Sequence, residues 1–514
     1  MATVIRSFAL SGVNAYSVTV ETVTLHGQPS VNIVGMGDTA VKEAAHRLEA
    51  SLTYGSFEFP KLKVVINLAP SGIKKSGSHF DLAMAISLLL EAGQVLLDRE
   101  ELSDSAFIGE LSLNAELRSV SGVLPMVIAA RESGMKRIFV PFENYREASL
   151  VKGLEIYAFK SLGDVIGFLQ GKQEYCPPNF EEGEKFRDSH EDLDFADVRG
   201  QDVLIEYIVA AVAGGHNILM IGSPGCGKSM IAKRISTIMP ELSEEEALEI
   251  TRIYSITGHL RERRSLVTER PFRSPHHNAS MNSLVGGGSP VVPGEISLAH
   301  NGILFLDEIA EFDKKSLDAL RQPMEDKVVT VSRVKSTGVF PSNFMLVAAM
   351  NPCPCGYYGQ PRCRCTDYEV LKYRQKISGP ILDRIEVHKY VQPVNFLNLS
   401  AQVKGRSSNE LKEQVQKARR IQQERFSGIP SVNSNAQMTE AMIKEFCRLD
   451  LESTQLLSLA FDKFQYSART YNKFLKTART FADLEESDVI RKKDVSAALM
   501  SRDLDKDRSG MLVV

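Results

Sequence analysis

A glycine-rich segment of eight residues, set between an apolar run and a helix-forming run, constrains this chain more than any other feature. It fits the pattern G-x-x-x-x-G-K-[ST] and consists of Gly222, Ser223, Pro224, Gly225, Cys226, Gly227, Lys228 and Ser229. The mainly apolar run 217–221 predicts a buried strand before it, and residues 230–235 predict a helix after it. Glycines let backbone N–H groups turn toward an anion, and a helix N-terminus adds positive potential. The segment therefore predicts a phosphate-binding loop in an α/β sheet rather than an unliganded turn.

Two further apolar runs end in polar residues that would complete a nucleotide site. Residues 303–306 predict a buried strand followed by Asp307 and Glu308, and residues 344–350 predict another strand that ends at Asn351. Ligands collect at the carboxyl ends of strands in open α/β sheets. We expect Ser229 and Asp307 to hold Mg²⁺, Lys228 to reach the β- and γ-phosphates of ATP, and Glu308 to polarise the attacking water.

The order of these motifs resembles that of AAA+ ATPases in the branch that includes magnesium chelatase and MCM helicases. The segments 271–277, 294–302, 320–326 and 351–356 are more specific, and with them the whole chain resembles the bacterial ComM/YifB family. The resemblance implies that Asn351 is a sensor 1 residue and that Arg469 is the sensor 2 arginine of a helical lid. It also implies that Arg384 is an arginine finger acting on the ATP of a neighbouring subunit. An isolated surface salt bridge is the alternative for Arg384.

Composition bounds the class of protein without identifying it. The chain has 514 residues, 43% of them hydrophobic and 24% charged, which predicts two or three globular domains. A net charge of −3 argues against a small, wholly basic nucleic-acid binder but not against a ring with a basic pore. The sequence shows neither an 18-residue apolar stretch nor an N-terminal signal pattern. We therefore expect a cytoplasmic protein with reduced cysteines and no membrane partner.

The predicted organisation is α/β and multidomain. Residues 1–171 alternate strand and helix patterns, and with the resemblance they imply a degenerate Lon-protease-like domain. Residues 172–196 are rich in acidic residues and predict a linker. An AAA+ core with a parallel sheet is expected at 197–394, an α-helical lid at 395–502 and a polar tail at 503–514. The core would carry two insertions and a cysteine cluster at 353–365.

Proteolysis of the Lon type requires a serine–lysine dyad, which the N-terminal domain does not clearly supply. In the matching segment 75–81, His79 stands near the expected nucleophile position. The segment 120–125 has no lysine where the general base is expected. Ser76 and Ser78 keep a protease function open as a minor alternative to a role in assembly or substrate contact.

Four of the seven cysteines fall within 13 residues, at Cys353, Cys355, Cys363 and Cys365. Tetrahedral zinc accepts four thiolates, so the cluster predicts a structural zinc site. The C-x-C spacing departs from the usual C-x₂-C, which leaves free thiols and a redox disulfide as alternatives. Cys226 occupies a variable position of the phosphate loop, where small size is its expected role and oxidant sensitivity the alternative.

Two insertions distinguish this ATPase pattern from a plain one. The first contains the glycine-rich stretch 286–290 and the second the alternating stretch 328–338, which leads to a turn with Arg333 and Lys335 near its tip. In the resembling branch both insertions face a central pore, so the two cations would contact a DNA backbone. A solvated hairpin is the alternative. His276 and His277 are adjacent and have no evident third ligand, which favours an interface or packing role over metal binding.

These predictions together favour a ring-forming ATPase, implied to be a hexamer. The resemblance implies a DNA motor that drives branch migration in recombination and natural transformation. A chelatase-type ATPase that remodels a partner protein is the runner-up. A Lon-like protease and a non-catalytic scaffold are the remaining alternatives.

Overall fold

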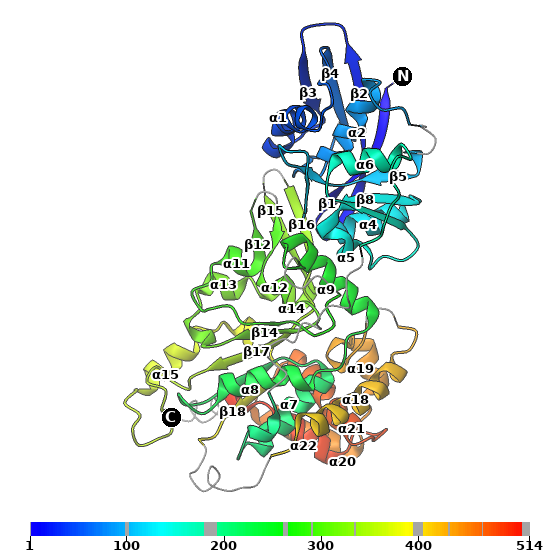
Figure 1. The fold of residues 1–514 in the computed structure, drawn as a ribbon. Coiled ribbons are helices and arrows are strands. Elements are labelled where there is room, and N and C mark those ends of the chain that lie inside the picture. The colour runs from blue at the N-terminus through cyan, green and yellow to red at the C-terminus, as the bar shows by residue number, and fades with distance from the viewer. Residues whose placement is uncertain are drawn as a thin grey trace.

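The computed structural model describes residues 2–97, 102–178, 193–260, 266–288, 291–333, 336–393, 405–429, 432–464 and 466–505. Figure 1 shows three bodies stacked along one direction, namely an N-terminal α/β domain, a central α/β core, and a group of helices at the C-terminal side. Most of the predicted linker, 179–192, and the predicted start of the lid at 395–404 lie outside the described residues.

The N-terminal domain is built on a mixed sheet of order β3-β4-β2-β1-β5-β8-β9. Strand β1 pairs antiparallel with β2 and parallel with β5, so the strand pairing changes from antiparallel to parallel in the middle of the sheet. Its largest core cluster packs α1 and the buried middle of α2 on the sheet. The bounds are β1 Thr3–Ser11, β2 Asn14–Leu25, β3 Ser30–Val34, β4 Lys63–Ala69, β5 Ser105–Phe107, β8 Arg137–Pro141, β9 Glu155–Phe159, α1 Thr39–Tyr54, α2 Asp81–Glu91, α4 Val123–Glu132, α5 Tyr145–Ala148 and α6 Leu162–Leu169. The short hairpin β6 Glu110–Leu111 and β7 Leu117–Arg118 flanks it.

The central core is a parallel sheet of order β11-β14-β17-β10-β18. Strands β10, β14 and β17 are buried along their whole length, as expected for a sheet covered on both faces. The strands are β10 Ile218–Ile221, β11 Phe272–Arg273, β14 Ile303–Leu306, β17 Met345–Met350 and β18 Val387–Tyr390. The helices of the core region are α7 Asp202–Gly214, α8 Lys228–Ile235, α11 Met281–Val285, α12 Glu295–Leu298, α13 Lys314–Asp318, α14 Arg321–Asp326, α15 Asp367–Arg374 and α16 Gly379–Leu382.

Both predicted insertions of the core form hairpins. The first is β12 Gly286–Gly287 with β13 Val292–Pro293, and the second is β15 Val328–Arg333 with β16 Ser336–Pro341. The second hairpin points toward the N-terminal domain in Figure 1, where Val13, in the turn after β1, packs against the core cluster that includes Val329 and Val331.

Helix α9, Glu244–Thr257, joins the core to the N-terminal domain. Ser243 and Glu246 form a capping box at its start. Near its C-terminal end, the Ser255 carbonyl accepts a hydrogen bond from the Gly122 N–H at 3.0 Å, and Leu248 packs on the cluster formed by α4. The helix therefore reaches from one body of the molecule into the next.

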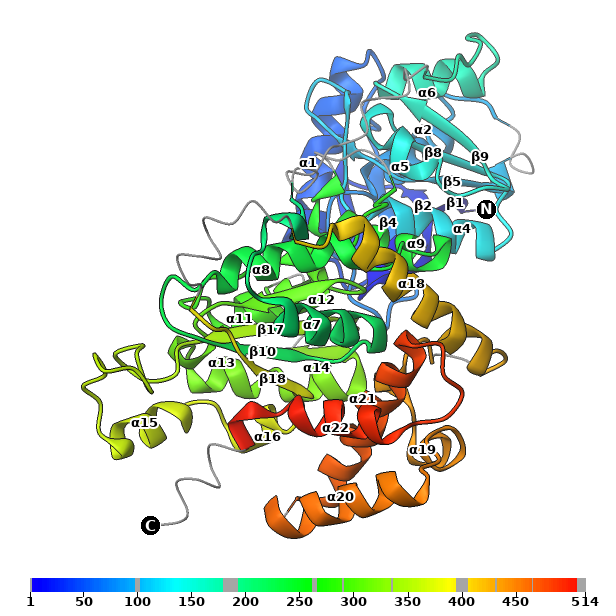
Figure 2. The same cartoon turned by 90° about the horizontal axis from the view of Figure 1, so that it is seen from below.

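The C-terminal helices are α18 Ser408–Arg425, α19 Glu440–Phe446, α20 Leu451–Phe464, α21 Ala468–Leu484 and α22 Lys492–Met500. Figure 2 shows α21 and α22 beneath the core sheet and α20 at the outside. The predicted tail begins at residue 503, but the first residues after 502 still pack against the core. Leu504 is only 5% exposed in a core cluster, and Asp503 lies 2.9 Å from the Lys389 ammonium.

Candidate nucleotide site and the opposite edge of the sheet

The glycine-rich loop lies between β10 and α8, in the strand–loop–helix context that the sequence predicts. Gly225 and Gly227 adopt φ angles of +80° and +91°, which a side chain would strain. A Cβ at Gly222 would lie 2.9 Å from the Val391 carbonyl oxygen and 2.6 Å from Cys226 Sγ. The loop is thus tightly packed at its first glycine, and its last glycine directly precedes α8.

Lys228 connects the loop to the end of the neighbouring strand. Its Nζ donates to the carbonyl oxygens of Gly222 at 2.7 Å and Ser223 at 3.1 Å, and to Asn351 Oδ1 at 3.2 Å. The lysine is 9% exposed. The structure therefore brings together the ammonium and the polar tip of β17 that the sequence predicted separately.

Ser229 and Asp307 face each other across two adjacent elements. The Ser229 hydroxyl donates to Asp307 Oδ2 at 2.6 Å, and Asp307 Oδ1 accepts from the Glu308 N–H at 3.0 Å. A hydroxyl and a carboxylate at one point are oxygen donors of the kind that Mg²⁺ takes beside a nucleotide. The donor set therefore fits a magnesium ion, with Ser229 and Asp307 as its protein ligands.

Glu308 stands at the same sheet edge with a half-exposed side chain. Its backbone is left-handed, with φ of +50°, at the point where β14 ends. His277 Nδ1 lies 3.8 Å from Glu308 Oε2, and the rings of His276 and His277 lie 4.1 Å apart. The sequence predicted an interface or packing role for this histidine pair and did not reveal its proximity to Glu308. The signal that could have found it is the parallel pairing of β11 with β14, because this pairing carries the residues after β11 to the edge where Asp307 stands.

Arg384 and Arg469 lie together, but not beside the glycine-rich loop. Both line a cavity of about 780 Å³ between the core and the C-terminal helices. Its walls include residues that precede the parallel strands, namely Asn217 before β10, Gly302 before β14, Phe344 before β17 and Glu386 before β18. This cavity therefore opens at the amino ends of the strands, whereas the loop lies at their carboxyl ends.

Asn217 ties this second edge together. Its side chain donates to the Arg384 carbonyl oxygen at 2.8 Å and accepts from the Leu346 N–H at 2.8 Å. The four residues of β10 lie between Asn217 and Gly222, which are five steps apart, or about 16 Å at 3.3 Å per residue. Arg384 itself is 20% exposed in its side chain, forms an ion pair with Glu325 and donates to the Pro380 carbonyl oxygen at 2.7 Å.

Seven cationic side chains and six carboxylates line this cavity. Burial lowers the pKa of Lys327, of Lys473 and of Lys476 below the usual lysine value. Burial, and then the charge of Arg270, lowers the pKa of Arg419 to about 10. Desolvation therefore disfavours the charged form of these four groups, although nearby carboxylates offset most of the positive charge of the cavity.

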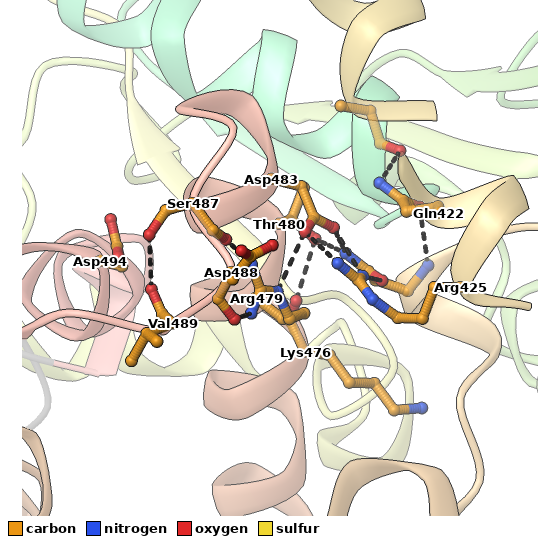
Figure 3. Close-up of polar contacts among 12 residues, drawn as sticks. Gln422, Arg425, Lys476, Arg479, Thr480, Asp483, Ser487, Asp488, Val489 and Asp494 are labelled. Atoms are coloured by element: carbon orange, nitrogen blue, oxygen red, sulfur yellow. Dashed lines mark hydrogen bonds and ion pairs between the residues drawn. The ribbon is translucent and has the colours of Figure 1, made fainter. Parts of the chain in front are cut away.

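A buried ion-pair network fixes the helix that carries Arg469, Lys473 and Lys476. Figure 3 shows Asp483 between Arg425 and Arg479, with α18 on one side and the segment after α21 on the other. Asp483 Oδ2 accepts from Arg425 Nη1 at 2.8 Å, and Asp483 Oδ1 accepts from Arg479 Nε at 3.0 Å. Arg479 also donates to the Asp488 carbonyl oxygen at 2.8 Å. The network holds α21 in place against α18.

The four clustered cysteines converge. Their Sγ atoms all lie within 4.8 Å of one another, and all four are unbonded thiols. Cys226 is also a free thiol, and burial raises its pKa, so the loop does not activate it. The helix N-terminus that sequence reasoning considered as an activating influence is outweighed by desolvation of the thiol.

The predicted DNA contacts lie at the edge of what the structure describes. Arg333 ends β15 opposite Ser336, while Lys335 lies outside the described residues, as do residues 289–290 of the first insertion. Their role stays a prediction.

The N-terminal segment that resembles a protease site is engaged otherwise. Lys75 is buried and donates to the Pro70 carbonyl oxygen, and the Ser78 hydroxyl donates to Glu110. Burial lowers the pKa of His79 to about 4, so its imidazole is neutral. The Ser78 hydroxyl therefore faces a carboxylate rather than a lysine, and Lys75 is bonded to a carbonyl oxygen, so these two residues do not form a serine–lysine dyad.

Across the described ranges, no helix has both the length and the apolar character that crossing a membrane requires.

Three family profiles match successive parts of the chain. Residues 194–399 match magnesium chelatase, subunit ChlI; residues 20–144 match subunit ChlI of Mg-chelatase; and residues 405–502 match the C-terminal part of that subunit.

Individual relatives are similar over nearly the whole length. The chain is 38% identical over 505 residues to YifB of Escherichia coli K12, covering 98% of this chain and 97% of YifB. It is 38% identical over 501 residues to competence protein ComM of Haemophilus influenzae Rd, covering 96% of each. A shorter match, 33% over 99 residues, joins 19% of this chain to 17% of Lon protease 2 of Bacillus subtilis.

Proposed function

This chain belongs to the magnesium-chelatase-like ComM/YifB family, and from that premise we propose that it is an ATP-hydrolysing AAA+ motor that acts on DNA as a ring. The pair of contacts at one sheet edge, Lys228 with Asn351 and Ser229 with Asp307, carries the ATPase part of the proposal. These four side chains come from β10–α8, β14 and β17 and meet where a parallel sheet binds ligands.

The residues of this edge divide the work of hydrolysis. Loop N–H groups and the Lys228 ammonium bind the phosphates, and Ser229 with Asp307 holds Mg²⁺, which supplies charge neutralisation when bound. Glu308 orients and polarises the attacking water. His277, near the Glu308 carboxylate, restricts where that carboxylate points. Asn351 accepts from Lys228 and positions the ammonium.

The position of Arg384 and Arg469 supports a ring. Both line the cavity at the amino ends of the strands, across the sheet from the loop of the same chain. We infer that they act on the nucleotide of the neighbouring subunit, whose loop edge would face this cavity. An arginine supplied in this way is worth about 10³–10⁵ in rate, so the ring is the catalytic unit, and the family resemblance implies a hexamer.

The DNA part of the proposal rests on kinship with competence protein ComM and on the hairpin β15–β16. Its predicted tip carries Arg333 and Lys335, two cations spaced to follow a phosphate backbone. We propose that the ring moves along DNA and drives branch migration in recombination, including natural transformation.

The test is the ATPase rate measured with single-stranded, duplex and four-way-junction DNA. We expect DNA to raise the rate, and we expect Glu308→Gln to abolish hydrolysis with every substrate. Lys335→Glu should lose the stimulation by DNA, whereas Lys314→Glu, the same charge change at the exposed start of α13, should keep it. A rate indifferent to all three DNA structures would contradict the DNA motor.

A partner-remodelling ATPase of the chelatase type is the second candidate. The three magnesium chelatase profiles, which together span most of residues 20–502, favour it. It predicts ATPase activity that is independent of DNA and that rises when a partner protein is added.

A further inference from the structure

A segment of 16 residues, 351–366, runs between the end of β17 and the start of α15 without helix or strand. Connections of this length with no regular structure usually need another source of order. Its buried residues are Pro352, Cys353 and Gly356, which supply little apolar side-chain surface, so a hydrophobic core does not account for that order. The segment also contains all four clustered cysteines.

The thiols are spaced as ligands of a single tetrahedral ion would be. Zinc–sulfur bonds of about 2.3 Å in a tetrahedron place the sulfur atoms about 3.8 Å apart. Cys353 Sγ lies 3.4 Å from Cys355 Sγ and 3.9 Å from Cys363 Sγ, and the latter two are 3.6 Å apart. Cys365 Sγ completes the set within 4.8 Å of the others. Four thiolates select soft ions, and among abundant divalent ions zinc suits them best.

The same segment packs directly on the glycine-rich loop. Gln360 Nε2 donates to Ser223 Oγ at 2.8 Å. Gly356 follows the second cysteine with φ of +85°, and a Cβ there would lie 2.6 Å from Pro224 Cδ. Two consecutive loop residues, Ser223 and Pro224, are therefore held by residues that lie between the second and third cysteines.

We propose that Cys353, Cys355, Cys363 and Cys365 bind one zinc ion and that the loop so closed braces the nucleotide-binding loop through Gln360 and Gly356. The ion fixes the segment, and the segment fixes Ser223 and Pro224. Nucleotide affinity then depends on an ion that does not touch the nucleotide. Zinc binding is inferred from the thiol geometry alone, whereas the effect on nucleotide affinity rests on the proposed ATP site.

The first measurement is the metal content of protein purified without chelators. We expect one zinc per chain, released stoichiometrically by an organomercurial, and none in the double variant Cys355→Ser/Cys363→Ser. Cys176→Ser, which changes an exposed cysteine outside the cluster, should keep the zinc. Absence of metal from the unaltered protein, or iron in place of zinc, would overturn the zinc assignment.

The second measurement is the dissociation constant of a fluorescent ATP analogue. We expect Gln360→Ala to keep one zinc and to weaken binding about fivefold, the effect of one lost hydrogen bond. Gly356→Ala should weaken binding more, because its Cβ displaces Pro224. Gln375→Ala, at an exposed glutamine after α15, should change neither quantity.

Unchanged affinity in Gln360→Ala and Gly356→Ala would overturn the bracing. If the unaltered protein fails to bind the analogue, the proposed ATP site fails, and the zinc count still decides the metal site. The Cys355→Ser/Cys363→Ser variant is not needed for the affinity measurement, so its folding does not affect this outcome.

Discussion

The two edges of the core sheet differ in how many parts of the proposed nucleotide site they hold. At the carboxyl ends of the strands, Lys228 bonds to Asn351 and Ser229 bonds to Asp307. At the amino ends, Arg384 and Arg469 line a cavity in which cations and carboxylates are mixed, and burial lowers the pKa of three of its lysines. In the proposed ring, the first edge would bind a nucleotide with its own residues, and the second would contact the nucleotide of the neighbouring subunit. The proposal therefore divides one catalytic set between two subunits.

Mixing two inactive variants gives the largest effect that tests this division. Glu308→Gln and Arg384→Ala should each lose about 10³-fold or more of the ATPase rate. Co-expressed in equal amounts and purified through two different tags, they should regain about one quarter of the unaltered rate, because half of the subunits supply each intact edge at random. The measurement is the steady-state ATPase rate of the mixed assembly.

The matched control for that mixture combines two defects at the same edge. Glu308→Gln mixed with Lys228→Ala leaves every carboxyl edge defective, so the mixture should stay inactive. If the first mixture also stays inactive, Arg384 serves its own subunit and the two edges do not divide the site.

Loss of the buried carboxylate of Asp483 gives the next largest effect. Asp483 pairs with Arg425 and Arg479 and is fully buried (Figure 3). Asp483→Ala leaves both guanidinium groups without their carboxylate and should cost about 3–5 kcal/mol in the stability of the C-terminal helices. Urea unfolding followed by circular dichroism measures it, with the exposed Glu486→Ala as the control.

Because α21 carries Arg469, Lys473 and Lys476, the Asp483→Ala variant should disturb the amino edge and leave the carboxyl edge intact. Affinity for the ATP analogue should stay close to that of the unaltered protein, while the ATPase rate falls. A parallel loss of affinity would show that the two edges do not act separately.

Acid should weaken the amino edge by a smaller amount. Burial, followed by the charges of Lys476 and Arg419, lowers the pKa of His216 to about 3. Between the ordinary histidine pKa of about 6.5 and 3, the unfolded chain holds a proton that the folded chain excludes, so stability falls as the pH drops. This histidine should account for about 2 kcal/mol of loss between pH 7 and pH 5.

Urea unfolding at the two pH values checks this prediction. His216→Gln should lose about 2 kcal/mol less than the unaltered protein on going from pH 7 to pH 5, whereas His26→Gln, at an exposed histidine, should follow the unaltered protein. Equal losses in His216→Gln and the unaltered protein would contradict the role of this buried imidazole.

Residues that end apolar runs were the ones that sequence reasoning located best. The runs before Gly222, Asp307 and Asn351 are buried strands of one parallel sheet, and period and composition reveal such strands. In the N-terminal domain, Asp38 and Gly55 cap α1 as local capping preferences predict. Local signals were sufficient in these places because the chemistry sits next to the pattern that positions it.

Contacts between distant segments were not predictable in the same way. His277 lies 31 residues before Glu308, and Gln360 lies 137 residues after Ser223, so only the completed sheet brings each pair together. Arg384 comes just before β18, so the sheet edge at which it lies depends on the direction in which β18 runs in the sheet. The packing of Leu504 was missed because a short polar C-terminal run gives no sign of the surface that receives it.

Helix α9 has a further consequence. Glu245 and Glu246 at its start line the cavity that holds Arg384 and Arg469, and Ser255 near its end bonds to the N-terminal domain. Its 14 residues span about 21 Å, and each residue is rotated by about 100° around the helix axis relative to the one before. The number of residues in α9 therefore affects both the distance between the two bodies and their rotation relative to each other. Lengthening it by one residue would move the attached domain by only about 1.5 Å but would swing it through more than a quarter turn.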